Sequence, residues 1–576
     1  MTSETRWVLA PEPPPEVEIA LQRFPPLWRR LLYARGLTNY AAAKAFLEAH
    51  PPPTVEDPFG LQDMEAAVDR LAYALHHHEP IAVYGDYDVD GVTATALMVQ
   101  VLQALGGNVR PYIPNRFDEG YGVHADALRR LYEDGVRLVL TVDCGIRPPE
   151  PIAQAQAWGL DVIVTDHHTP GPELPPARAV VNPKRADDPY PAKELAGVGV
   201  AFKLAQALVQ RLAPERADAL RQFLDLVALG TVADVVPLTG ENRYWVRAGL
   251  HQLRQPQRQG LRALIGVAGL QPERIHATHI GFILGPRLNA AGRLDSAMAA
   301  LRLLLTDDLW EAGQLAQQLE AQNRRRQYLT DQIVRAAETM AVSDPDNPPW
   351  LIFAAHPDFS LGVVGLAAAR LVERYHRPTL IAHQEGELLR GSGRSIPGLH
   401  LTHALDQCRE YLLRYGGHAA AAGFTLAIDR LPAFLECLQA TIRQKLQGQD
   451  LRPTLRADAE VTLAQMTPEF LHQLRWFEPT GMGNPRPRFI VRGARLQQVR
   501  AMGTRGQHLR FWVDDGTARR KAVAFRQGHW APHLAPAMDL LFTLEWDTYN
   551  GQYDIQLNVR DMRPARPPET PPGGPS

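Results

Sequence analysis

The segment Ile81–Gly91 constrains this chain more than any other, and it reads Ile-Ala-Val-Tyr-Gly-Asp-Tyr-Asp-Val-Asp-Gly. Its first half is typical of a buried parallel strand, and its second half places Asp86, Asp88 and Asp90 at alternate positions. Residues two apart project to the same side of an extended chain, so these carboxylates can converge just after the strand. The sequence from 92 to 102 predicts a helix, and strand–turn–helix units carry their chemistry at strand carboxyl ends.

Three carboxylates this close together repel one another. Two carboxylates about 4 Å apart repel by about 4 kcal/mol at an effective dielectric constant of about 20. A divalent cation between them removes that penalty. A solvated acidic turn explains a lone Asp-x-Asp equally well, so the interpretation depends on the strands that follow.

Two further strands are predicted at 137–142 and 161–165, with a helix at 149–158 between them. The first of these strands ends in Asp143-Cys144-Gly145, and the second ends in Asp166-His167-His168. Three successive strand ends therefore bring carboxylates or imidazoles to the same edge of a sheet. This repetition favours a metal site over a solvated turn.

A seventh candidate ligand is Asp234, which interrupts the apolar stretch Gly230–Pro237. A charged side chain is rarely buried without a partner, so Asp234 either caps a helix or binds a metal, and its surroundings favour the metal. The full candidate set is Asp86, Asp88, Asp90, Asp143, His167, His168 and Asp234.

Charge balance within this set favours two metal ions. Its five carboxylates carry five negative charges, of which two dications neutralise four and a single dication only two. Oxygen-rich ligation with imidazole suits Mn²⁺, with Mg²⁺ as the alternative, and the absence of thiolates indicates that the site is not structural zinc. Two such ions about 3.5–4 Å apart can activate water and stabilise in-line attack on phosphorus. The predicted chemistry is phosphoester hydrolysis.

Several cationic segments rich in small residues are candidate substrate contacts. The loop 115–122 places Arg116 with two acids and two glycines, which fits an ordinary turn or a backbone clamp on a phosphate. The segment 285–296 fits either a ligand-contacting surface or a helix start with salt-bridged arginines. Its candidate residues are Arg287, Asn289 and Arg293.

The region 350–450 is predicted to be mixed α/β. It follows a helix, about 50 Å long, that the absence of proline allows over 307–341. Ser392 and Arg394 lie in a small cationic segment. The triplet Gly416-Gly417-His418 allows a backbone to lie against a phosphate. A helix C-cap explains the glycine pair equally well.

Residues 452–565 alternate short apolar runs with turns, which predicts a small β-barrel. Between Arg486 and Arg526 there are eleven Lys or Arg and two Asp, with Phe489, Phe511, Trp512 and Phe525 interleaved. Cations follow a phosphate backbone and aromatic faces stack bases. A plain half-buried barrel shows the same pattern, but nucleic-acid binding is favoured.

Bulk composition excludes several classes of protein. The chain has 576 residues and a net charge of −2, which predicts three or four domains without a global nucleic-acid signal. No apolar run reaches the roughly 18 residues of a membrane span, and the N-terminus does not resemble a signal peptide. Cys144, Cys408 and Cys437 show no CxxC spacing. We therefore expect a reduced cytoplasmic protein without a disulfide.

The acidic and histidine motifs, taken together with Gly230–Asp234, resemble the four signature motifs of the DHH phosphoesterase superfamily. The segment from Gly416 to Gly423 resembles the glycine-rich motif of its DHHA1 domain. The long helix, the loop at 115–122, the segment 287–293 and the barrel resemble the bacterial RecJ family of single-stranded-DNA exonucleases. This resemblance covers about 60–562. It implies an α/β fold with a parallel-sheet DHH domain, a long connecting helix, a smaller α/β DHHA1 domain and an OB-like barrel.

The resemblance also implies domain boundaries and roles. The expected parts are an N-terminal helical cap 1–75, a DHH domain 76–305, the helix 306–342, a DHHA1 domain 343–450, an OB domain 451–565 and a disordered tail 566–576. Asp88 and Asp90 would each hold one metal, with Asp86 in or beside the ligand set. Asp143 and Asp234 would be shared by both metals, His167 would bind the second, and His168 would be catalytic or support a ligand. The expected contacts to the 5′-phosphate end are Arg116, Arg287, Ser392 and Arg394. Gly416, Gly417 and His418 would contact the backbone near the scissile bond.

The implied activity is 5′→3′ removal of mononucleotides from single-stranded DNA in recombination and repair. The implied partners are a single-stranded-DNA-binding protein and a RecQ-type helicase, with the chain itself monomeric and not bound to a membrane. The main alternative is a phosphodiesterase for short oligonucleotides or cyclic dinucleotides, whose relatives lack the barrel. A third alternative, a catalytically inactive DNA-binding scaffold, would have lost some of the acids, and all of the expected ones are present.

Overall fold

The computed structural model describes residues 5–48, 57–115, 119–120, 122–547 and 554–565. Contacts divide the chain into two compact units. Of the described residues, those within 57–236 and 248–453 form one unit, and those within 5–48, 237–247, 454–547 and 554–565 form the other. The predicted phosphate contact Arg116 and the predicted disordered tail 566–576 lie outside the described residues.

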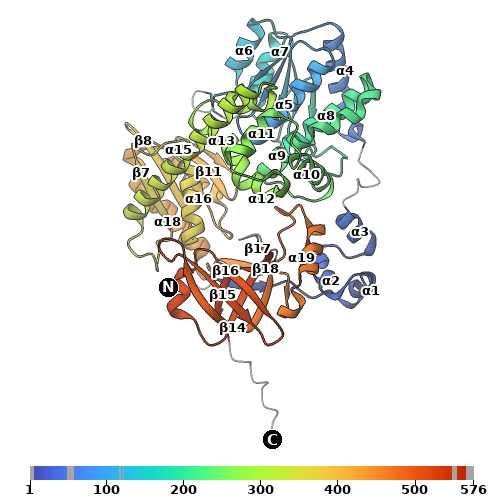
Figure 1. Ribbon diagram of the computed structural model, residues 1–576. Helices are drawn as coiled ribbons and strands as arrows, with labels where there is room; N and C mark the ends of the chain where they lie inside the picture. Colours follow the sequence, from blue (N-terminus) through green and yellow to red (C-terminus); the bar gives the residue numbers. More distant parts are fainter. Residues whose placement is uncertain (1–4, 49–56, 116–118, 121, 548–553, 566–576) are drawn as a thin grey trace. The chain divides into compact units, whose positions relative to one another are not determined.

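A parallel sheet of five strands, in the order β3-β2-β4-β5-β6, forms the centre of the first unit (Figure 1). Its strands are β2 (Ile81–Gly85), β3 (Val109–Tyr112), β4 (Leu138–Val142), β5 (Asp161–Thr165) and β6 (Ala179–Val181). β2 and β4 are buried throughout, which explains their continuous apolar sequences. Gly85 pairs with Val142, and Val142 pairs with Thr165. Three strands therefore end level, and the residues that follow them meet at one edge.

Helices cover both faces of this sheet. α6 (Ala125–Glu133) and α7 (Glu150–Ala157) share a core with one face. α5 (Val89–Ala104) and α8 (Gly197–Leu212) contact β4, and Figure 1 shows them on the other side. The remaining α-helices between residues 57 and 305 are α4 (Met64–His76), α9 (Leu224–Ala233), α10 (Gly240–Leu253), α11 (Gln259–Val267), α12 (Ala277–His279), α13 (Gly285–Leu294) and α14 (Met298–Leu305).

The long predicted helix is present as α15 (Leu309–Ala341), which has 33 residues. Asp308 caps it by accepting a hydrogen bond from the N–H of Glu311. It packs against α11, α13 and α14, and also against α16 (Val364–Tyr375) and β7 (Ile352–His356). It therefore connects the parallel-sheet region to the next sheet within the same unit.

That second sheet has five strands in the order β10-β11-β9-β8-β7. Only β7 and β8 are parallel within it. Its other strands are β8 (Thr379–Glu385), β9 (Leu388–Arg394), β10 (Arg414–Gly417) and β11 (Ala421–Ala427), and its other helices are α17 (Leu401–Asp406) and α18 (Leu431–Leu446). Gly416 and Gly417 lie in β10, so the helix C-cap interpretation of this pair is wrong.

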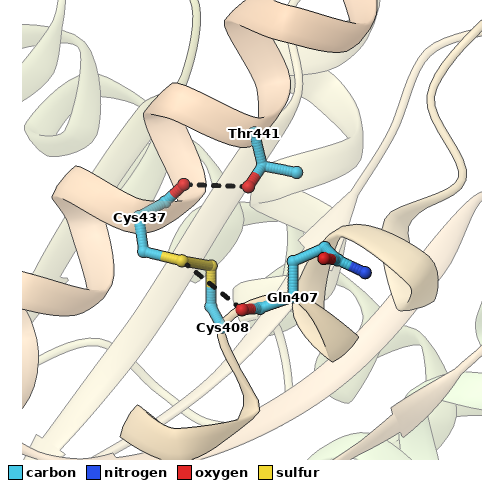
Figure 2. Close-up of a disulfide and its surroundings, with 4 residues drawn as sticks. All are labelled: Gln407, Cys408, Cys437 and Thr441. Atoms are coloured by element: carbon cyan, nitrogen blue, oxygen red, sulfur yellow. Dashed lines mark hydrogen bonds between the residues drawn. A yellow bond between two sulfur atoms is a disulfide. The ribbon is translucent and has the colours of Figure 1, made fainter.

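The expectation of no disulfide is also wrong. Cys408 and Cys437 form one, with their Cα atoms 6.0 Å apart (Figure 2). The Sγ of Cys437, on α18, lies 3.7 Å from the backbone oxygen of Gln407; this is a contact only, because a disulfide sulfur has no proton to donate. Spacing could not reveal the pair, since its members are 29 residues apart and meet only when α18 packs against the region of α17.

The second unit is built around a closed barrel. The strands pair in the cycle β14-β15-β16-β18-β17-β14. They are β14 (Phe489–Met502), β15 (His508–Asp514), β16 (Arg519–Ala524), β17 (Met538–Asp547) and β18 (Asp554–Pro564). β13 (Ala459–Glu460) extends the sheet beside β14, and β1 (Arg6–Leu9) pairs with β12 (Thr454–Ala457). The predicted OB-like barrel is confirmed.

The N-terminal helices share the hydrophobic core of this barrel. They are α1 (Pro15–Ala20), α2 (Pro26–Tyr33) and α3 (Tyr40–Glu48), and α19 (Pro468–Gln473) packs with them. Leu31 and Leu47 belong to the same buried cluster as Phe477 and Phe489. α4, by contrast, belongs to the first unit. The two compact units are defined by spatial contacts, and the bounds of the six expected parts of the chain stay predictions.

Within the described part of the chain, no helix is both long and apolar enough to span a membrane.

Candidate metal centre

The acidic turn after β2 is held in a fixed shape by its own backbone. Asp88 caps α5 by accepting hydrogen bonds from the N–H groups of Asp90 (2.9 Å) and Gly91 (3.1 Å). Asp86 and Asp90 are buried. A Cβ atom at position 91 would lie 2.6 Å from the backbone nitrogen and oxygen of Asp86. The motif therefore needs glycine there for the turn to close.

Asp90 points at the amino end of α8. It accepts hydrogen bonds from the backbone N–H groups of Gly197 (2.6 Å) and Val198 (2.9 Å). The positive end of the helix dipole favours a carboxylate in this place. A Cβ atom on Gly197 would lie 2.5 Å from Oδ1 of Asp143. The helix can approach both carboxylates this closely only because it begins with glycine.

Residues from three strand ends and from the end of α9 converge around His167. Its Nε2 lies 3.1 Å from Oδ1 of Asp143, 3.6 Å from Oδ2 of Asp234 and 3.8 Å from Oδ2 of Asp90. Asp143 has a φ of 62°, a left-handed conformation that aspartate tolerates better than most residues. Burial and the charge of His168 lower the pKa of His167 to about 3, so its imidazole is neutral and these contacts are not ion pairs.

The ligand-type atoms fall into overlapping groups. Atoms of Asp86, Asp88 and Asp143 lie within 4.8 Å of one another, as do those of Asp90, His167 and Asp234. Oδ1 of Asp143 and Nε2 of His167 are buried without a hydrogen-bond partner among the described residues. Buried polar atoms almost always have a partner. Lone pairs left open on oxygen and imidazole nitrogen fit a divalent cation of the Mn²⁺ or Mg²⁺ type.

The electrostatics of the carboxylates support this interpretation. Burial, followed by the charge of Asp88, raises the pKa of Asp90 to about 7. Burial and the charge of Asp90 raise the pKa of Asp234 to about 9. The pKa of Asp143 is raised well above its usual value for the same reasons. Without added positive charge these groups cannot all ionise near neutral pH.

His168 lies beside these ligands and has a different environment. Its Nδ1 is 2.8 Å from Oδ1 of Asp166, which also accepts hydrogen bonds from the backbone N–H groups of His167 and His168. Burial would lower the pKa of His168, but the hydrogen bond and the charge of Asp166 outweigh it and raise the pKa to about 9. The same hydrogen bond outweighs the effect of burial on Asp166 and lowers its pKa to about 2. His168 is therefore a cation with a defined ring orientation.

The structure thus brings together every predicted metal ligand. Sequence reasoning missed the orienting role of Asp166 and the two N–H donors Gly197 and Val198. Asp166 was visible in the motif, and the helix start Gly197-Val-Gly199 was the available signal for the donors. The local sequence of neither motif predicts which residue it contacts in the folded chain.

Two predicted substrate residues on α13 already have partners in the protein. The side chain of Asn289 accepts a hydrogen bond from the N–H of Val89 (3.0 Å), which holds the acidic turn in place. Arg287 forms an ion pair with Glu320 (2.7 Å) on α15, as the salt-bridge alternative expected. Contacts with DNA by these residues stay predictions.

Most of the other predicted residues line one cavity of about 370 Å³ within the first unit. Arg293, Ser392, Arg394, Gly416 and Gly417 all contribute to it. His418 is not among the lining residues and lies exposed just after β10. The cavity is bounded by two guanidinium groups and glycine-rich backbone, which is a composition that suits an anion.

The amino end of α16 also borders this cavity, through Leu361, Gly362, Val364 and Gly365, and sequence reasoning missed it. A Cβ atom on Gly365 would lie 2.9 Å from Nη2 of Arg394 and 3.0 Å from Oγ of Ser392. The glycine makes room for the guanidinium group, and the helix end adds partial positive charge.

Comparison with known proteins agrees with this geometry. Three family descriptions match: "DHH family, N-terminal domain" over 80–231, "DHHA1 domain" over 347–444 and "RecJ OB domain" over 457–561. The single-stranded-DNA-specific exonuclease RecJ of Dickeya dadantii (strain 3937) is 37% identical over 570 residues, covering 94% of this chain and 96% of that protein. The chain belongs to the RecJ family.

Solved RecJ structures match the whole fold. A crystal structure of Thermus thermophilus RecJ with Mn²⁺ matches with a TM-score of 0.83 and 33% identity, covering 100% of this chain and 82% of that chain. A structure of the same RecJ with Mg²⁺ matches with a TM-score of 0.76 and 31% identity, covering 98% and 79%. RecJ proteins are thus crystallised with both ions that the acidic groups of this chain suit.

Proposed function

We propose that this chain hydrolyses single-stranded DNA from its 5′ end, releasing mononucleotides, in DNA recombination and repair. One observation carries the proposal: two clusters of possible metal ligands lie side by side after the parallel strands. One cluster contains Asp143 and the other contains His167, and these two side chains are 3.1 Å apart. Family membership supports it, since the curated relatives are named single-stranded-DNA-specific exonucleases. The 5′→3′ direction rests on the family resemblance.

We further propose two divalent ions, Mn²⁺ or Mg²⁺. Asp86, Asp88 and Asp143 would hold one, Asp90, His167 and Asp234 would hold the other, and Asp143 would serve both. When bound, such ions supply positive charge that acidifies water and stabilises the charge developing on a phosphoryl group.

The remaining tasks fall to side chains of this protein. His167 is neutral and offers the lone pair of its Nε2 as a ligand. His168 holds one proton on Nδ1, shared with Oδ1 of Asp166, and that contact favours a second proton on Nε2, which the ring could give to the leaving oxygen. The amino end of α8 keeps Asp90 in position through two hydrogen bonds.

The strand itself would be held by cationic surfaces in each unit. In the first unit, the cavity containing Arg293 and Arg394 suits a backbone phosphate. In the second, the guanidinium of Arg519 lies 4.5 Å from the ring centre of Trp512 on the barrel. Arginine and aromatic side chains side by side are typical of surfaces that bind single strands. The matched RecJ OB region favours long strands over dinucleotides.

The domain boundaries 1–75, 76–305, 306–342, 343–450, 451–565 and 566–576 belong to the same proposal. So do a monomeric state, location in the cytoplasm, and cooperation with a single-stranded-DNA-binding protein and a RecQ-type helicase. The two protein partners follow from the family resemblance.

The deciding experiment is digestion of end-labelled single strands with Mn²⁺. A 5′ label should be released as a mononucleotide at once, whereas a 3′ label should stay on long products, and duplex DNA should resist. Dinucleotides should be cleaved far more slowly than long single strands. If dinucleotides are cleaved faster than long single strands, the protein is instead a phosphodiesterase for small substrates.

A variant isolates the metal centre. Asp143→Ala should abolish cleavage while leaving the fold and much of the DNA binding intact, because the cavity and barrel do not involve it. Asp307→Ala, at an exposed carboxylate before α15, is the matched control and should cleave normally. Cleavage by Asp143→Ala at the rate of the unmodified protein would refute the assigned site.

A further inference from the structure

The fourth strand of the parallel sheet places a cation at the same edge as the metal ligands. β6 pairs in parallel with β5, and Val181 lies beside Thr165, so the residues that follow the two strands lie side by side. The chain after β6 reads Asn182-Pro183-Lys184. The neighbouring strand ends supply acids and histidines, so Lys184 has a charge opposite to that of the carboxylates around it.

The turn that carries Lys184 is fixed by a buried amide. The side chain of Asn182 is fully buried, and it donates a hydrogen bond to the backbone oxygen of His168 (2.9 Å). It also accepts a hydrogen bond from the N–H of Lys184 (2.8 Å). The next residue, Arg185, is held by the carboxylate of Asp63 (2.7 Å). The backbone of Lys184 is therefore tied through one side chain to the histidine pair.

The ammonium group of Lys184 lies against the segment that leads into α8. Its Nζ is 3.4 Å from Oε2 of Glu194, three residues before Gly197, whose N–H holds Asp90. The Lys184 side chain is 25% exposed and that of Glu194 is 58% exposed, so this ion pair is in contact with water. An ion pair of this kind stabilises the fold little. An incoming anion can therefore replace Glu194 as the partner of the lysine at small cost.

The charge of Lys184 acts on two of the predicted metal ligands. Burial and the charge of Asp90 raise the pKa of Asp234, and the charges of His168 and Lys184 oppose that rise. Burial and the charge of His168 lower the pKa of His167, and Lys184 acts in the same direction. The ammonium group is therefore near enough to these ligands to interact with a phosphate held among them.

Charge balance gives this lysine a task in the proposed reaction. The five predicted carboxylate ligands carry five negative charges, two divalent ions would supply four positive ones, and the hydrogen-bonded pair of His168 and Asp166 adds none. A bound phosphodiester brings one further negative charge, and attack by hydroxide brings another. A cation fixed beside the ligands offsets the charge that develops as the attack proceeds.

We propose that Lys184 is a catalytic residue that contacts a nonbridging oxygen of the scissile phosphodiester and stabilises the negative charge developing there. The inference rests on the proposed nuclease function and deepens it by one residue outside the metal ligands. Glu194 holds the ammonium group in place before the strand binds, and the phosphoryl oxygen then replaces Glu194. Lys184 keeps its proton throughout and forms no covalent bond.

The first test measures kcat and KM on single-stranded DNA with saturating Mn²⁺. Lys184→Met keeps the length of the side chain without its charge, and it should lower kcat by about a hundred-fold. KM should stay within about three-fold, because the charge that Lys184 meets is largest in the transition state. Lys184→Arg keeps the charge and should retain kcat within about ten-fold. Lys193→Met is the matched control and should cleave normally, because Lys193 contacts Asp188 instead.

Two binding measurements separate this role from a structural one. In calorimetric titrations without DNA, Lys184→Met should bind Mn²⁺ at least as tightly as the unmodified protein, because a positive charge near the ligands is removed. Inorganic phosphate is mainly a dianion at pH 8 and so carries the added charge of the transition state. It should inhibit Lys184→Met about ten-fold more weakly than the unmodified protein.

Four results would each overturn the inference. They are a kcat in Lys184→Met within about three-fold of normal, an equal loss in Lys184→Arg, weaker Mn²⁺ binding by Lys184→Met, and unchanged inhibition of that variant by phosphate. If the unmodified protein digests no single-stranded DNA, the proposed function fails instead, so the two failures can be told apart.

Discussion

Replacing Asp234 by asparagine should stabilise the metal-free protein, although it removes a metal ligand. Burial and the charge of Asp90 raise the pKa of the Asp234 carboxyl from 3.8 to about 9. Because the folded state holds the proton more tightly than the unfolded state, the free energy of unfolding falls as pH rises from about 4 towards 9. An amide of the same shape carries no charge and removes this penalty.

The magnitude follows from the pKa difference. At pH 7 the unfolded carboxyl is about three pH units above its pKa, and each unit corresponds to about 1.4 kcal/mol, so the upper limit is about 4 kcal/mol. Asp90 and Asp143 share the excess protons with Asp234. We therefore expect the amide to recover roughly 1–3 kcal/mol.

The assay is urea unfolding with EDTA at pH 4.5, 7 and 8.5, followed by tryptophan fluorescence. Asp234→Asn should be more stable than the unmodified protein at pH 7 and 8.5, and the difference should shrink to at most about 1 kcal/mol at pH 4.5, close to the unfolded pKa of 3.8. Asp90→Asn is the matched comparison at the same site. Its carboxylate accepts two backbone N–H groups, and an amide would leave one of them unpaired at a loss of about 1–3 kcal/mol, cancelling the gain.

Saturating Mn²⁺ should reverse the order. At a hundred times its Kd an ion stabilises the folded state by about 2.7 kcal/mol, and the variant that lacks a ligand should gain less. Asp307→Asn, at an exposed carboxylate, should match the unmodified protein throughout. If Asp234→Asn is no more stable than the unmodified protein in EDTA at pH 7, repulsion does not govern this centre.

Three other predictions concern separate parts of the chain. Gly197→Ala should weaken Mn²⁺ binding at least about ten-fold by calorimetric titration, because its Cβ would lie 2.5 Å from Oδ1 of Asp143. Gly266→Ala on α11 would meet nothing within 4 Å, so unchanged binding there is the control, and unchanged binding in Gly197→Ala would contradict the assigned geometry. Arg394→Ala should lower the affinity for single-stranded DNA and reduce the salt dependence of binding by about one counterion. Arg390→Ala, on the same strand but outside the cavity, should change neither quantity. Equal losses of affinity in the two variants would show that the cavity does not bind the DNA. Cys437→Ser should lower the unfolding free energy of the oxidised protein by about 2–4 kcal/mol. Dithiothreitol should lower the unfolding free energy of the unmodified protein by the same amount and should leave the variant unchanged. If thiol labelling finds a free thiol at Cys437 in the air-oxidised protein, the disulfide does not form.

Local sequence patterns were sufficient to predict which acidic and histidine side chains lie close together. A strand followed by acids is recognisable over about ten residues, and parallel strands bring their carboxyl ends to one edge whatever their order in the sheet. Asp86, Asp88, Asp90, Asp143, His167 and Asp234 therefore converge as expected. The barrel was recognisable for a similar reason, since alternation with period two needs only the sequence of each strand.

Tertiary structure alone decided the contacts between distant residues. Asp90 meets Gly197, 107 positions away, and Asn289 meets Val89, 200 positions away. Cys408 pairs with Cys437, and the N-terminal helices share a hydrophobic core with the barrel. No local pattern predicts these contacts, because each depends on which apolar surfaces pack together when the whole chain folds. The sequence by itself determined which groups can bind metal, and packing decided how each group is held.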